Sequence, residues 1–160
     1  MKDKNPTKQP NICLWSFAVL SAALIVFIFL RSLQPAPDSN AESLALTGWL
    51  RGVFDPQGHF SLGDWNNAIR KAAHFIEFAV LGICVGGFTA SLGGLLCKRF
   101  VTLPMLICLL TAAVDEGIQK FIPGRSSSGT DVLLDFCGAV CGIAVISLIF
   151  LRIHKKKRSC

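Results

Sequence analysis

The chain has 160 residues, of which 52% are hydrophobic, and its mean hydropathy is +0.54. These values are high for a water-soluble domain and typical of a small multi-pass membrane protein. The formal net charge is +6. Its basic residues stand in short runs beside apolar segments, without interleaved aromatic residues, which argues against a nucleic-acid-binding protein.

Four apolar runs each reach the roughly 20 residues that a helix needs to cross a bilayer. They predict spans at residues 12–30, 72–96, 100–119 and 132–151. The first run contains no charged residue, so it lacks the polar face that a water-soluble bundle requires. The sequence therefore predicts an all-α fold, an integral membrane four-helix bundle. Its parts are a basic leader at 1–11, a long connection at 31–70, a core at 71–152 and a basic tail at 153–160.

The charges predict the orientation of these spans. Ten of the sixteen basic residues lie in the amino-terminal leader, in the link between the second and third spans, and in the carboxyl tail; they are Lys2, Lys4, Lys8, Lys98, Arg99, Arg152, Lys155, Lys156, Lys157 and Arg158. Basic residues are enriched on the cytoplasmic side of membranes. We therefore expect both termini in the cytoplasm and the protein in a plasma membrane, with a homo-oligomer as an open alternative to a monomer.

The connection at 31–70 is then extracytoplasmic. It opens with a segment rich in Pro and Ser at 34–40, which predicts a linker. Apolar residues at helical spacing follow, among them Trp49 and Phe54, and predict a short helix on the outer leaflet or a cap packed on the bundle. Asp64 occupies the expected N-cap position of the helix that continues into the second span.

Ionisable residues recur at helical spacing at one end of the last three spans. They are Arg70, His74 and Glu77 in the second, Asp115, Glu116 and Gln119 in the third, and Asp131 and Asp135 in the fourth, with Arg125 in the preceding turn. Residues three or four apart share a helix face. The predicted topology places all of them in the outer half of the membrane, so we expect one cluster there.

This cluster permits several chemistries. His74, Glu77, Asp115 and Glu116 are candidate acid, base or ligand groups. A divalent metal is a possible cofactor, because His and carboxylate oxygens are suitable ligands; the candidates are His74, Glu77, Asp115 and Asp135. Arg70, Gln119, Arg125, Asp131 and Asp135 are candidates for ligand binding. The alternative is that these groups pair with one another and only fix the helices in register.

Small residues predict where the helices meet. Gly82 and Gly86 form a G-x-x-x-G motif in the second span, and Gly138 and Gly142 form another in the fourth. This spacing allows helix backbones to approach closely. Gly138 and Gly142 share a face with Asp131 and Asp135, so the acidic face should point into the bundle.

Two segments resemble the signatures of the VanZ-like membrane family. The first runs from Arg70 through His74 and Glu77 to Gly82, and the second from Asp115 through Arg125 to Asp135 and Gly138. Phe78 stands where members of the family commonly carry Tyr. The resemblance implies a bacterial multi-pass protein and directs interest to the ionisable residues named above. The family takes its name from a member associated with low-level resistance to the glycopeptide teicoplanin.

Three functions remain open from the sequence. The first is an envelope protein that binds or modifies a lipid or cell-wall precursor headgroup at the outer leaflet, with an effect on glycopeptide sensitivity. The second is a subunit of a proton- or metal-coupled carrier, although the inner half of the spans offers no matching polar path. The third is a non-catalytic membrane scaffold. The sequence does not decide whether the protein is an enzyme.

Overall fold

A computed structural model describes residues 12–55, 57, 59–92, 99–125 and 128–158. Their regular structure is helical: α1 (Ile12–Ser32), α2 (Ala36–Phe54), α3 (Leu62–Ser91), α4 (Arg99–Gln119) and α5 (Gly129–Arg158). Four of these helices, α1, α3, α4 and α5, are long and apolar enough to cross a membrane. This confirms the predicted all-α, four-span architecture. The predictions for the leader at 1–11 and for Lys98 lie outside the described residues.

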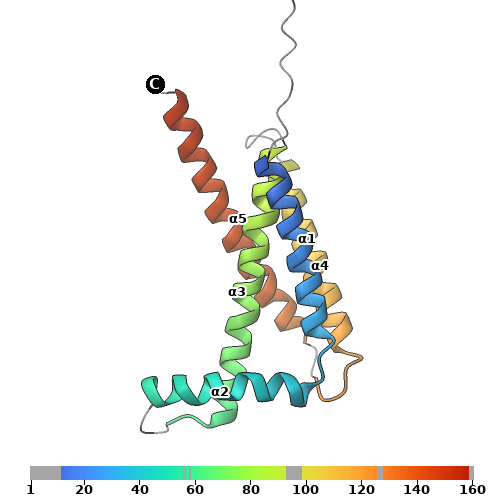
Figure 1. Cartoon of the computed structure of the whole chain (residues 1–160), viewed down its shortest axis with the longest axis vertical. Coiled ribbons are helices and arrows are strands. Elements are labelled where there is room, and N and C mark those ends of the chain that lie inside the picture. The colour runs from blue at the N-terminus through green and yellow to red at the C-terminus, as the bar shows by residue number, and fades with distance from the viewer. Residues whose placement is uncertain (1–11, 56, 58, 93–98, 126–127, 159–160) are drawn as a thin grey trace, which may run out of the picture.

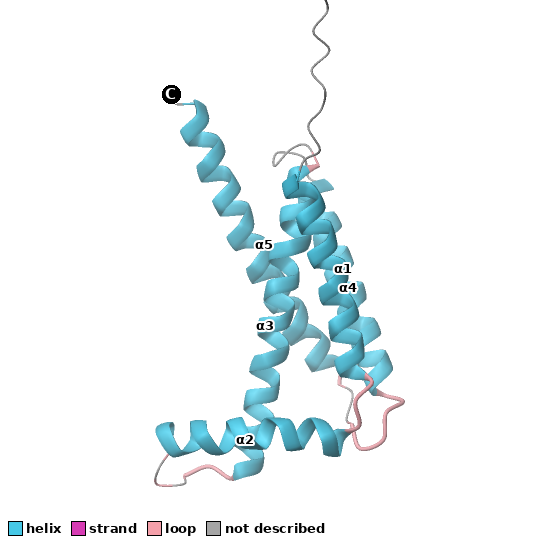
Figure 2. Cartoon of the chain, viewed as in Figure 1, coloured by secondary structure: helices cyan, strands magenta, loops and turns pink. Residues whose placement is uncertain are grey.

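The four long helices run alternately up and down, and α2 lies across one end of them (Figure 1). The start of α1 and the end of α5 lie at the opposite end. The connections on either side of α2 and the one between α4 and α5 gather at the α2 end (Figure 2). The ends of α1 and α4 and the starts of α3 and α5 therefore meet beside α2.

The interface of α3 with α5 is the largest in the bundle, and its glycines explain why. A Cβ atom at Gly82 would overlap the backbone of Ala139, and one at Gly142 would overlap the backbone of Ala79. The two G-x-x-x-G motifs thus pack against each other, as their spacing predicted. The buried core beside this contact contains Ile28, Phe78, Leu81, Val85, Cys108, Ala112, Ala139 and Ile143.

Helix α2 is longer than the sequence indicated. The predicted linker at 34–40 is wrong from Ala36 onward, because the chain is already helical there, with Pro35 at the N-cap. Pro37 follows in the first turn, where the missing N–H of a proline needs no partner. The predicted helix around Trp49 and Phe54 is confirmed, and these two side chains are exposed.

The connection from α2 to α3 is held by Asp55. Its carboxylate accepts hydrogen bonds from the backbone N–H groups of His59 (2.9 Å) and Phe60 (3.0 Å) and from the indole N–H of Trp65 (3.3 Å). The Thr47 hydroxyl donates to the side-chain oxygen of Asn66, at 3.2 Å. These bonds attach α2 to the first turns of α3 and fix its position beside the bundle.

Two helix starts show how local sequence sets the boundaries. The predicted N-cap at Asp64 is wrong: Ser61 is the N-cap of α3, and its hydroxyl accepts the N–H of Asp64. The Ser61 hydroxyl also donates to the Asp64 carboxylate at 2.7 Å, which resembles a capping box. Ser128 precedes α5, and its hydroxyl accepts the N–H of Thr130 at 3.3 Å.

The turn after α4 begins as its sequence predicted. The N–H of Arg125 donates to the carbonyl oxygen of Ile122 at 3.2 Å, and Gly124 between them has φ 76°. Pro followed by Gly at the centre of such a turn is typical of type II geometry, in which the second central residue needs a positive φ. The turn places Arg125 next to the last turn of α1, where its side chain contacts the backbone of Arg31.

Candidate functional site

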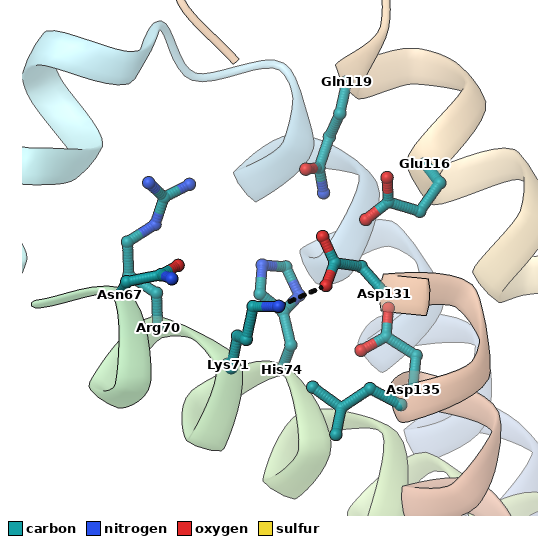
Figure 3. A pocket seen from close by; sticks show the side chains of 9 residues that line it. Asn67, Arg70, Lys71, His74, Glu116, Gln119, Asp131 and Asp135 are labelled. Atoms are coloured by element: carbon teal, nitrogen blue, oxygen red, sulfur yellow. Dashed lines mark ion pairs between the residues drawn. The ribbon is translucent and has the colours of Figure 1, made fainter. Parts of the chain in front are cut away.

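The polar residues predicted on three spans meet at the α2 end of the bundle. Helix α3 contributes Arg70 and His74, α4 contributes Glu116 and Gln119, and α5 contributes Asp131 and Asp135 to one cavity; Asn67, Lys71 and Leu134 complete its lining (Figure 3). The cavity has a volume of about 60 Å³. A cavity needs roughly 10 to 15 Å³ by this measure to hold one water molecule, so this cavity admits a few waters, an ion or one small polar fragment.

Asp115 is fully buried next to this cavity. The Ser32 hydroxyl donates to Asp115 Oδ1, and Gln119 Nε2 donates to Asp115 Oδ2 at 3.0 Å. Gln119 Nε2 also lies 3.4 Å from Ser32 Oγ. Two helices therefore hold the Asp115 carboxylate in one orientation, with the last turn of α1 supplying one donor and α4 the other.

His74 and Asp135 face Asp115 from the two remaining helices. One donor atom from each of these three residues lies within 4.8 Å of the others. The prediction that His74 approaches Asp115 is therefore confirmed in its geometry, and Asp135 belongs to the same group. Asp135 is 1% exposed, and neither of its carboxylate oxygens has a hydrogen-bond partner within the described part of the chain.

The other acidic groups of the cavity have partners. Glu116 Oε2 accepts the backbone N–H of Ser128 at 3.1 Å, which joins α4 to the start of α5. Asp131 Oδ1 pairs with Lys71 Nζ at 2.9 Å, the ion pair drawn in Figure 3. Both groups therefore have a structural role in addition to any role in binding.

Besides Asp115, two predicted residues lie outside the cavity lining. Glu77 is half-buried one turn further along α3, within electrostatic range of Arg31 and Arg125. Arg125 Nη2 donates to the backbone carbonyl oxygen of Arg31 at 3.2 Å and so satisfies an acceptor at the end of α1. The structure thus groups Glu77 and Arg125 around the end of α1, and the remaining candidates around the cavity.

The sequence analysis missed Ser32, Lys71 and Asn67. Ser32 was assigned to the connection at 31–70, whereas Arg31 and Ser32 form the last turn of α1. A basic residue in the last turn of a helix is favoured by the helix dipole, so Arg31 was a signal that α1 continues. Lys71 and Asn67 share the face of Arg70 and His74 at helical spacing, and this pattern could have identified them.

A family model described as VanZ/LLP1 matches residues 17–151. The chain belongs to the VanZ/LLP1 family. The matched region of this VanZ/LLP1 chain includes every cavity residue and most of each candidate span, so the resemblance of the two signature segments is confirmed. A search of curated proteins gave no match. A search of solved structures gave no match either.

Proposed function

We propose that this VanZ/LLP1 protein binds the anionic headgroup of a cell-envelope lipid or lipid-linked precursor at the outer leaflet of the bacterial plasma membrane. The observation that carries the proposal is the polar cavity, which three spans line at the membrane-surface end of an apolar bundle. Arg70 and Lys71 contribute positive charge to its lining. Guanidinium and ammonium groups are the usual protein partners of phosphate.

The position of α2 supports a site at the membrane surface. Leu46, Trp49, Val53 and Phe54 on this helix are 51 to 70% exposed, and α2 runs across the ends of the spans (Figure 1). An apolar face with a tryptophan is typical of a helix that lies in the interface of a bilayer. The neighbouring cavity would then lie at the depth of the headgroups.

The size and charge of the cavity limit what enters it. About 60 Å³ accommodates a phosphate-sized group and excludes a whole lipid, whose tails would stay in the bilayer. Ionisable groups below the membrane surface cost roughly 2.5 to 3.5 kcal/mol each at the bilayer centre and less near the interface. The packed glycines of α3 and α5 hold these helices together without such groups, which favours a binding role over a scaffold.

The carrier alternative receives less support. The charged residues among the buried polar groups of the described chain are Asp55, Asp115, Glu116 and Asp135, and all lie toward the α2 end. Towards the opposite end the buried polar residues include Ser21 and Thr89, whose hydroxyls donate to carbonyls of their own helices. A coupled carrier needs ionisable groups accessible from both sides.

The proposal is tested in a host whose own copy is deleted and whose teicoplanin sensitivity changes as a result. We expect His74→Gln and Asp115→Asn to abolish complementation while the protein still accumulates in the membrane. Arg152 is exposed at the far end of α5, so Arg152→Gln is the matched control and should complement. Full complementation by both cavity variants would contradict a binding role, as would a loss that parallels loss of the protein.

A further inference from the structure

The side chains of His74, Asp115 and Asp135 converge on one point between α3, α4 and α5. Within the described residues they form the one group of three or more His, Cys, Asp or Glu side chains placed to share an ion, with donor atoms within 4.8 Å of one another. In a tetrahedral Zn²⁺ site with bonds of about 2.0 to 2.2 Å, the ligand atoms lie about 3.3 to 3.6 Å apart. Side-chain movements of about 1 Å would therefore seat an ion.

Asp135 provides independent evidence that something is bound there. Its side chain is almost completely buried and lines the cavity, yet both carboxylate oxygens lack a hydrogen-bond partner in the described structure, and so does His74 Nδ1. Buried polar groups in proteins are nearly always satisfied, and buried carboxylates are paired or coordinate metals. An unsatisfied buried carboxylate that lies within 4.8 Å of an imidazole nitrogen and of a second carboxylate indicates a cation.

Asp115 has the support that metal-binding carboxylates usually have. Ser32 and Gln119 each donate a hydrogen bond to it, which fixes the carboxylate while lone pairs remain for an ion. Outer partners of this kind orient ligands and tune affinity. Ser32 comes from α1, so all four long helices contribute to the arrangement.

We propose that His74, Asp115 and Asp135 bind a divalent transition-metal cation, with Zn²⁺ or Mn²⁺ as the class that suits one imidazole nitrogen and two carboxylate oxygens. Three protein ligands leave a tetrahedral ion with one open position. The cavity of about 60 Å³ beside it has room for a water molecule in that position. The two acidic ligands would offset the charge of the cation.

The open position on the cation would also take part in binding the headgroup. This part of the inference rests on the proposed function. An oxygen of the phosphate headgroup would replace the water on the cation, while Arg70 and Lys71 of the cavity lining neutralise the remaining charge. The cation would thereby allow an anionic group to approach the acidic residues Asp131 and Asp135, which would otherwise repel it.

The test is the stoichiometry of Zn²⁺ bound to the purified full chain in detergent, after stripping with EDTA and reloading with Zn²⁺ alone. We expect one tightly bound Zn²⁺ per chain. Asp135→Asn and His74→Gln should each weaken binding by at least about tenfold. Asp64→Asn, which removes an exposed carboxylate of α3 outside this cavity, should bind like the wild type. Substoichiometric binding by the wild type would overturn the proposal, as would unchanged affinity in Asp135→Asn.

The X-ray absorption spectrum of the Zn²⁺-loaded wild type gives a readout that does not depend on how the variants fold. The proposal predicts a shell of nitrogen and oxygen ligands with one imidazole. A sulfur shell would assign the ion to some of the seven cysteines of the chain and would overturn the proposal. Neither measurement involves a lipid, so a bound ion without headgroup binding would refute the proposed function and leave the metal site standing.

Discussion

Asp115 depends on a residue from a different helix for its orientation. The Ser32 hydroxyl, 1% exposed at the end of α1, donates to its carboxylate. Removing one partner of a buried polar group leaves the other unsatisfied, at a cost of roughly 1 to 3 kcal/mol. A substitution of Ser32 at the end of α1 should therefore change the stability of the site around Asp115 on α4.

Ser32→Ala should reduce the free energy of unfolding by about 1 to 3 kcal/mol for this reason. Ser16→Ala is the matched control in α1, because Ser16 is exposed and its hydroxyl donates to the carbonyl of Ile12 in its own helix, at 2.8 Å. Tryptophan fluorescence during unfolding in detergent measures both variants. Equal stabilities would mean that the Ser32–Asp115 contact contributes nothing.

The ionised carboxylate of Asp55 makes the α2–α3 connection sensitive to acid. Hydrogen bonds from the backbone of Phe60 and His59 lower its pKa from 3.8 to about 2. A lowered pKa stabilises the fold at pH above the unfolded-state value, and this stabilisation disappears as the pH falls through the folded-state value. The contribution should therefore be complete above about pH 4 and lost by about pH 2.

Asp55→Asn should remove that part of the acid dependence. We expect the variant to unfold at a lower temperature than the wild type at neutral pH, and the difference between the two proteins to shrink as the pH falls from about 4 to about 2. Melting temperatures in detergent across this pH range measure it. A difference that stays constant with pH would contradict the role given to the ionised carboxylate.

At the scale of helices, the close contact of α3 with α5 depends on glycines, which have no side chain to separate the two backbones. Even a methyl group at Gly142 would overlap the backbone of Ala79, whereas nothing lies within 4 Å of the position that a Cβ at Gly117 would take. Overpacking a close contact forces backbone shifts that cost about 1 to 3 kcal/mol. The acidic face of α5 carries this contact, so a shift would also displace Asp135.

Gly142→Ala should therefore destabilise the protein by about 1 to 3 kcal/mol. Gly117→Ala in α4 is the control, and we expect it to be neutral or stabilising by up to about 1 kcal/mol, since alanine favours a helix more than glycine does. Thermal unfolding in detergent compares the two. A Gly142→Ala variant as stable as Gly117→Ala would show that the helices are not in close backbone contact.

At the scale of the whole molecule, the apolar runs predicted the four spans well because burial in lipid requires long unbroken apolar helices. Their ends were predicted less well. The helix that continues into the second span was predicted to start after an N-cap at Asp64, whereas α3 begins at Leu62 with Ser61 as its N-cap. Polar spacing within single helices identified most of the cluster. Ser32 was missed because a lone serine at the end of a span has no periodic partner.

The orientation of the bundle remains a prediction from charge. Gln57 lies at the α2 end and Lys155 at the other. We expect a cysteine introduced at Gln57 to react with a membrane-impermeant maleimide in intact cells, and one at Lys155 to react only after permeabilisation, both in a chain without its native cysteines. A protected Gln57 site with a reactive Lys155 site would place the cavity on the cytoplasmic side and exclude an outer-leaflet headgroup.

The central claim is that the cavity binds an anionic headgroup, and native mass spectrometry of the purified protein tests it most directly. The protein is released from detergent with phosphatidylglycerol or with zwitterionic phosphatidylcholine. We predict retention of phosphatidylglycerol over phosphatidylcholine. Arg70→Gln should reduce this retention by about tenfold, as expected for the loss of a charge-assisted hydrogen bond, and Arg152→Gln should leave it unchanged. Equal retention of the two lipids, or equal effects of the two arginine variants, would contradict the claim.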